Sequence, residues 1–128
     1  MKFQPDLIGA ATISGYGPGW IAVGGERIKH SLVLHASGER APWNCDQFDH
    51  LTADHFASLA NAAPELVIFG SGERLRFPRP EWLRPLVEAR IGLETMDTAA
   101  ACRTYNILAG EGRRVVVALL VESNPAAS

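Results

Sequence analysis

The hydrophobic positions in the first forty residues follow the short alternation that is typical of β-strands, with glycines between the runs. The stretch ISGYGPGW holds three glycines around Pro18, which predicts a loop that turns or approaches another backbone closely. In WIAVGGERIKHSLVLH, Gly24 and Gly25 separate two extended runs, which predicts a hairpin with a two-residue turn of positive φ. Residues 31–35 continue as a strand, and SGERAPW ends this β region at another turn.

From residue 52 onward, apolar residues recur at helical spacing. Thr52 can cap a short helix, which Pro64 ends. The continuous apolar run ELVIFG predicts a strand that is covered on both faces. In PRPEWLRPLVEAR, Pro80 marks the start of a second helix. The apolar side of that helix is expected to consist of Trp82, Leu83, Leu86 and Val87.

The last third of the chain repeats this alternation of strand and helix. IGLETM predicts a short strand, and Asp97 or Thr98 can cap a helix that stops near Gly110. RRVVVALLVE then predicts a second buried strand. The order strand, helix, strand, helix, strand indicates an α/β fold with right-handed crossovers in a parallel sheet.

Length and charge narrow the class of protein. With 128 residues and 47% hydrophobic content, we expect a single α/β domain over residues 1–122 and a disordered tail over residues 123–128. A formal net charge of -2 argues against nucleic-acid and anionic-lipid partners. The start MKFQPDLIGA lacks the apolar core of a secretory signal, and the longest apolar run is far shorter than a membrane helix. We therefore expect a soluble cytoplasmic protein without membrane insertion.

The segment MDTAAACRTYNILAGEGRRVVVALL places Cys102, Arg103 and Asn106 on one predicted helix. The apolar stripe of that helix is formed by Ala101, Cys102, Tyr105, Leu108 and Ala109. We therefore interpret Cys102 as a packing residue, and a reactive thiol is the less favoured interpretation. Arg103 and Asn106 share a face at i, i+3, so they form either a polar pocket wall or an architectural contact.

A glycine-rich turn follows the first buried strand, the place where α/β proteins often bind phosphates. Gly70, Ser71 and Gly72 lack the third glycine of a dinucleotide fingerprint, and no Lys-Ser/Thr pair of a phosphate-binding loop follows. The backbone N–H groups of Ser71 and Gly72, together with Arg74 or Arg76, could still hold a small anion. The alternative is a tight turn with solvated arginines.

The stretch CDQFDHLTADH gathers residue types that bind zinc, but their spacing is poor. His50 and His55 are five apart across a predicted loop-to-helix junction, and Asp49 and Asp54 fit carboxylates near a helix N-terminus. We expect no metal site and no cofactor. Because no nucleophile elbow, Ser/His/Asp order or HExxH motif occurs, we predict no catalytic residues and favour a non-enzymatic role.

The run from LVIFGSGERLRFP to GLETMDTAAACRTYNILAGEGRRVVVALL resembles a family of small single-domain proteins of unknown biochemical function. That family includes the mitochondrial complex I assembly factor and the adipogenesis-associated Mth-type domain protein. The similar motifs are the Gly-Ser-Gly turn, Met96-Asp97-Thr98, Thr104-Tyr105-Asn106 and the segment 111–114. The likeness extends more loosely to ISGYGPGWIAVGGERIKHSLVLH.

The resemblance implies a three-layer α/β fold. A central mixed sheet would carry the parallel β-α-β-α-β half, with helices on one face and an additional N-terminal antiparallel β layer. The leading functional hypothesis is a non-enzymatic interaction or assembly-type protein with a protein partner. The alternative is a binding module or enzyme for a small anionic metabolite, with its site between the 70–76 loop and the helix carrying Arg103 and Asn106.

Overall fold

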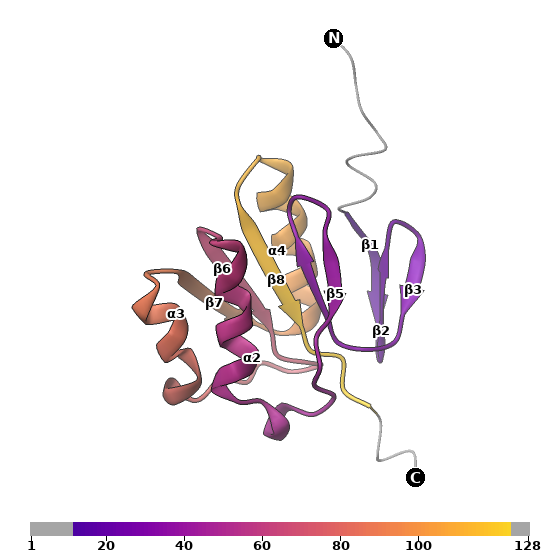
Figure 1. Ribbon diagram of the computed structural model, residues 1–128. Helices are drawn as coiled ribbons and strands as arrows, with labels where there is room; N and C mark the ends of the chain where they lie inside the picture. Colours follow the sequence, from indigo (N-terminus) through magenta and orange to yellow (C-terminus); the bar gives the residue numbers. More distant parts are fainter. Residues whose placement is uncertain (1–11, 124–128) are drawn as a thin grey trace.

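The computed structural model describes residues 12–123, which form two β-sheets and several short helices (Figure 1). The antiparallel three-stranded sheet has the order β1-β2-β3, with β1 (Ile13–Gly17), β2 (Trp20–Val23) and β3 (Glu26–Ile28). The five-stranded sheet has the order β5-β4-β8-β6-β7. Its strands are β4 (Leu32–His35), β5 (Arg40–Pro42), β6 (Leu66–Gly70), β7 (Gly92–Met96) and β8 (Val115–Leu119).

Two of the α-helices begin at residues that the sequence identifies as caps. The bounds of the α-helices are α2 (Ala53–Ala57), α3 (Arg84–Glu88) and α4 (Thr98–Gly110), and those of the 3-10 turns are η1 (Phe48–His50), η2 (Ser58–Ala62) and η3 (Pro80–Leu83). Asp97 caps α4, because its side chain accepts a hydrogen bond of 2.8 Å from the Ala100 N–H. At α2, the Thr52 N–H donates to His55 Nδ1 over 3.0 Å. Both predicted cap positions are confirmed.

The parallel half of the fold is as the sequence predicts. β6 pairs in parallel with β7 on one side and with β8 on the other. The chain leaves β6, passes through η3 and α3 to β7, and then returns through α4 to β8. β4 and β5 extend the sheet in the antiparallel sense, so the central sheet is mixed.

Both faces of this sheet are covered, and the two sides of β8 show how. Val115, Val117 and Leu119 belong to the core cluster that includes α4 and the three-stranded sheet. The intervening residues of the strand belong to the opposite cluster, which includes α2 and α3. The expectation of helices on one face only is therefore wrong, because a strand that is apolar on both sides needs cover on both. The three layers are confirmed (Figure 1). The N-terminal antiparallel sheet is confirmed as well, and it lies on the same side of the central sheet as α4.

Local differences from the predictions occur mainly at turns. ISGYGPGW turns at Pro18 and Gly19, as predicted, and the residues on either side of the turn pair as the first hairpin. SGERAPW contributes the short strand β5. The single helix expected here is divided into η3 and α3, with Pro85 in the first turn of α3. The buried residue of α3 is Leu86, and Val87, expected on the buried side, is 69% exposed.

The C-terminal end of the described residues is bonded to the domain. The Ser123 N–H donates to the Asp46 carbonyl over 3.1 Å, so this first residue of the predicted tail is bonded to the domain. Residues 124–128 of that tail, and the N-terminal stretch considered as a signal, lie outside the described residues. Among residues 12–123, no helix combines the length and the apolar character that crossing a membrane requires.

Candidate functional site

An open groove of about 990 Å³ lies at the carboxyl ends of the parallel strands. Its walls are the loop after β6, the first turn of α4, the segment after β8, and the tip of the β1–β2 hairpin. Ligands of open α/β sheets usually bind at this edge, so the groove is the candidate site. Of the residues singled out from the sequence, Gly72, Arg74 and Arg76 line it.

The loop after β6 is held by hydrogen bonds within the chain. The Ser71 N–H donates to the Met96 carbonyl, and the Gly72 N–H donates to Thr98 Oγ1, each over 2.9 Å. Ser71 is fully buried, and its hydroxyl donates to the Arg74 carbonyl and accepts from the Arg76 N–H. The two N–H groups predicted to hold an anion are therefore already bonded, and the turn is a structural anchor.

Gly70 is required by close packing between β6 and α4. A Cβ atom at this position would lie 3.0 Å from Thr98 Cα and 3.1 Å from the Ala101 Cβ. Since both neighbours belong to α4, any side chain at this position would push the helix away from the sheet. Gly70 thus sets the distance between the groove and α4, and does not itself line the groove.

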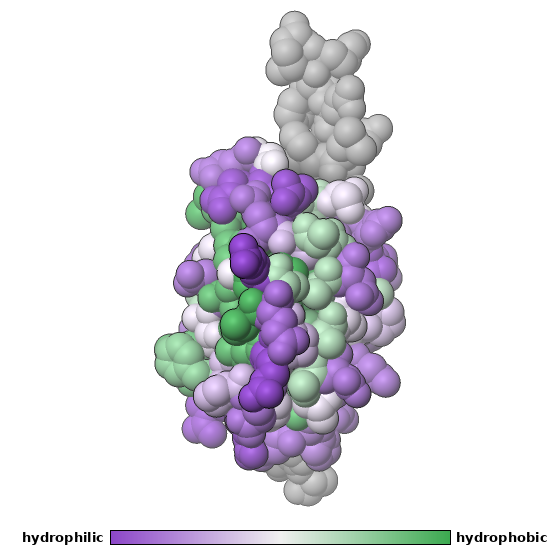
Figure 2. All heavy atoms as spheres, turned by 60° about the vertical axis from the view of Figure 1, so that its left-hand side comes forward, coloured by the Kyte–Doolittle hydropathy of each residue, from purple (hydrophilic) through white to green (hydrophobic). Residues whose placement is uncertain are grey.

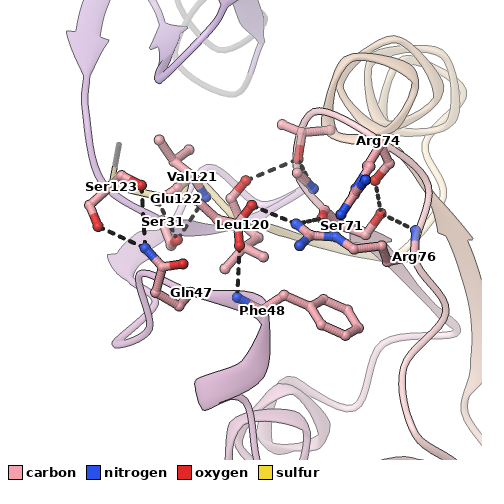
Figure 3. Close-up of polar contacts among 12 residues, drawn as sticks. Ser31, Gln47, Phe48, Ser71, Arg74, Arg76, Leu120, Val121, Glu122 and Ser123 are labelled. Carbon is pink, nitrogen blue, oxygen red and sulfur yellow. Dashed lines mark hydrogen bonds and ion pairs between the residues drawn. The ribbon is translucent and has the colours of Figure 1, made fainter. Parts of the chain in front are cut away.

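Arg76 bridges three segments at the floor of the groove (Figure 3). Its Nη2 atom donates to Glu122 Oε1 and to the Ser71 carbonyl, each over 2.6 Å. The second carboxylate oxygen of Glu122 accepts from the Phe48 N–H over 2.9 Å, and the Arg76 guanidinium lies over the Phe48 ring. This clamp joins η1, the loop after β6 and the segment after β8. Sequence reasoning missed Glu122, which lies 46 positions from Arg76.

A second set of contacts fixes the segment after β8 (Figure 3). The buried Ser31 hydroxyl accepts from the Val121 N–H over 2.8 Å and donates to the Val121 carbonyl over 3.3 Å. Gln47 Nε2 donates to the carbonyl and the hydroxyl of Ser123. The groove floor is therefore rigidly held, and most of its polar groups are satisfied internally.

Arg74 differs from its neighbours. Its side chain is exposed, and within residues 12–123 it has no ion-pair partner. It lies on the groove wall beside Glu73, so positive and negative charge alternate there. Arg74 is thus the cation of the predicted loop that can meet a ligand.

Arg103 and Asn106 connect α4 to the three-stranded sheet. Arg103 Nη1 donates to the Tyr16 hydroxyl over 2.8 Å, and this bond raises the pKa of Arg103 above its usual value. Asn106 accepts from the Ile13 N–H over 2.9 Å and donates to the Ile13 carbonyl over 2.8 Å. The groove meets α4 at Thr98 instead, so the structure does not bring these two residues together with the 70–76 loop.

Cys102 lies fully buried against the central sheet, as predicted. Burial is the largest cause that raises the pKa of its thiol, to about 12. The nucleophilic thiolate is therefore scarce at neutral pH. Tyr105 is also buried, with its pKa raised by burial to about 12, and its hydroxyl donates to the His35 carbonyl.

Residues between positions 45 and 55 that could bind zinc by type are hydrogen-bonded to nearby parts of the chain. Cys45 Sγ donates to the Gln47 carbonyl over 3.0 Å. His55 contacts the Asn44 carbonyl through Nε2 and receives the Thr52 N–H at Nδ1. In the part of the chain that the structure describes, no three potential ligands gather as they would around a metal ion.

The hairpin wall of the groove carries an indole that the sequence did not single out. A Cβ atom at Gly17 would lie 2.5 Å from Trp20 Nε1, which confirms the predicted close approach at this glycine. The Arg27 guanidinium lies 3.9 Å from the centre of the Trp20 ring. The glycine and the arginine together hold Trp20 in place.

Comparisons with known proteins agree with this fold. The chain is 38% identical to an uncharacterised protein of Rhodobacter capsulatus, over 91% of this chain and 90% of the other. It is 30% identical to NADH dehydrogenase (ubiquinone) 1 alpha subcomplex assembly factor 3 of Bos taurus, over 87% of this chain and 61% of that protein. The solution structure of a Mth938-like domain from Bordetella pertussis matches with a TM-score of 0.80 and 34% identity, over 100% of this chain and 97% of the other.

These similarities confirm the resemblance seen in the sequence motifs. A family model described as "Protein of unknown function (DUF498/DUF598)" matches residues 13–120, a range that includes every strand and helix of the structure. The chain therefore belongs to the DUF498 family.

Proposed function

We propose that this protein is a soluble, non-enzymatic assembly-type protein that acts by binding a protein partner. Its relative in Bos taurus is named as an assembly factor, which supports a role of this kind. Because the chain spans 61% of that relative's length, we do not assign the relative's partner to this chain. The cytoplasmic location expected from the sequence is part of the proposal, and fractionation of native cells tests it.

The observation that carries the proposal is the exposed apolar surface of the loop after β6. Phe77 is 70% exposed and Leu75 is 50% exposed, although both lie beside the well-anchored residue Arg76. The next residue, Pro78, is buried, and its ring fixes the φ angle of the backbone at this point. Large apolar side chains on an ordered support lose little entropy when a partner covers them, and phenylalanine is enriched at protein interfaces.

Exposed charges of both signs flank this loop, with Glu73 and Glu81 beside two arginines, and we propose that the arginines meet carboxylates of the partner. Arg74 and Arg79 are both exposed, one on each side of the apolar pair. An acidic rim on the partner would complement them and speed the encounter. We therefore expect partner binding to weaken as the salt concentration rises.

Co-purification from the organism that makes the protein tests the proposal. Tagged wild-type protein should retain a defined partner in stoichiometric amount, and the double variant Leu75→Ala, Phe77→Ala should lose it. Ile107→Ala is the matched control, because Ile107 is 61% exposed on α4, away from the loop. Absence of a stoichiometric partner, or its retention by the double variant, would contradict the proposal.

A second candidate function, binding of a small anionic metabolite, depends on Arg74 in the groove. A thermal-shift screen of phosphates, carboxylates and nucleotides tests it. A ligand at 100 times its dissociation constant stabilises the folded state by about 2.7 kcal/mol. The shift should disappear in Arg74→Ala. If wild type shows no shift with any of these compounds, the groove does not serve this purpose.

A further inference from the structure

β7 is the last strand of the central sheet, and its outer edge has no paired strand among residues 12–123. The Ser71 N–H donates to the Met96 carbonyl, so Met96 directs its backbone groups toward β6. In a parallel pair, alternate residues direct these groups to opposite sides. Leu93 and Thr95 therefore present their N–H and C=O groups at the free edge.

One side of this edge is apolar. Ile91 and Leu93 are partly buried against the core cluster beneath α2 and α3, and Thr95 has the same orientation as Leu93. Val87, 69% exposed, lies on α3, which packs against β7. Figure 2 brings the α3 and β7 side forward and shows apolar surface on both sides of a stripe of strongly hydrophilic residues that runs down the middle of this face.

We propose that this edge pairs with β7 of a second copy of the chain, antiparallel, with the two-fold axis at Leu93. The pairing is independent of the assembly role proposed above. It would join the two central sheets into one continuous sheet. Its ladder would contain about four hydrogen bonds, because Leu93 and Thr95 are free to donate whereas the Ile91 N–H already donates to the Leu86 carbonyl.

The side chains favour this register over its neighbours. With the axis at Leu93, that leucine faces its own copy, and Ile91 faces the Thr95 of the second chain. Glu94 then faces Gly92, which has no side chain to clash with it or to repel it. An axis at Glu94 would place two carboxylates opposite each other, which destabilises a sheet.

The helices on the same face as Leu93 add further apolar contact. A two-fold axis at Leu93, perpendicular to the sheet, would bring the two copies of α3 to the same side of the joined sheet. The exposed Val87 of each copy would then lie next to the Leu93 pair and cover it. This arrangement would give an apolar neighbour to the exposed Val87 of α3, a short helix in which Leu86 is the buried residue.

Disulfide cross-linking tests both the pairing and its register. In Leu93→Cys, the two Cα atoms would be about 5.5 Å apart, which is within the range that a disulfide spans. Copper phenanthroline in air should oxidise the two thiols to a covalent dimer. Glu94→Cys is the matched control, because its two copies are staggered along the strands and should cross-link at least about tenfold more slowly. Wild type controls for the native cysteines.

Sedimentation over a concentration series tests the pairing without new cysteines. Wild type should show a reversible monomer–dimer equilibrium, and Thr95→Pro should shift it to monomer. Proline at this edge position removes the outward N–H of Thr95 and no N–H of the β6–β7 ladder, so that ladder and the circular dichroism spectrum should be retained. A wild type that stays monomeric up to millimolar concentration, or equal cross-linking of Leu93→Cys and Glu94→Cys, would overturn the proposal.

Discussion

Asn106→Ala should loosen the three-stranded sheet from α4, because one amide side chain satisfies both backbone groups of the buried residue Ile13. A hydrogen bond contributes about 0.5–1.5 kcal/mol net, and a shielded group left unpaired costs about 1–3 kcal/mol. Since this contact is only partly buried, water can replace part of it. We expect a loss of about 2–3 kcal/mol in the free energy of unfolding, which is a large part of the about 5–15 kcal/mol of a typical domain.

Urea denaturation measures this loss, and hydrogen exchange at the Ile13 amide locates it. Asn61→Ala is the control, because Asn61 is an exposed amide on η2, and its removal should change stability by no more than about 0.5 kcal/mol. If Asn106→Ala proves as mild as the control, the amide is not the structural link inferred here. Its place on α4 would then favour a role in binding.

The variant Asn106→Asp tests separately the hydrogen bond that Asn106 accepts and the one that it donates. The introduced carboxyl can accept from the Ile13 N–H in either protonation state, but only its protonated form can also donate to the Ile13 carbonyl, as the native amide does. The variant should therefore approach wild-type stability in acid and be weakest at neutral pH.

The sequence predicts the parallel half of the fold well because its signals are local. β6 and β8 are continuous apolar runs, and Asp97 stands directly before the helix that it caps. β5 could not be predicted, since the residues Arg40–Pro42 are all exposed and become a strand only through pairing with β4. Its formation depends on a neighbour and not on its own composition.

The candidate site was only partly predictable, for a related reason. The glycine turn is visible in the sequence, but what its N–H groups can do depends on Met96 and Thr98, far along the chain. The same holds for Asn106, whose partner Ile13 lies 93 positions away. A polar residue next to a core helix can bind a ligand or another segment of the chain, and only the fold distinguishes these roles.

Two further predictions concern the core thiol and the hairpin wall. In native protein at neutral pH, iodoacetamide should label the half-buried Cys45 well before Cys102, because the thiol of Cys102 is fully buried and its pKa is about 12; faster labelling of Cys102 would contradict its packing role. Gly17→Ala should destabilise the hairpin by about 0.5–1.5 kcal/mol, the cost of a side chain forced off its rotamer, since the new Cβ would lie 2.5 Å from Trp20 Nε1 and must displace the indole. Gly15→Ala is the matched control, because its Cβ would find the same indole at 3.5 Å, an ordinary contact. The indole N–H resonance of Trp20 reports the displacement directly: it should move in Gly17→Ala and stay in Gly15→Ala. If both variants leave the resonance and the stability unchanged, the indole does not lie across this strand, and the groove lacks the aromatic wall described above.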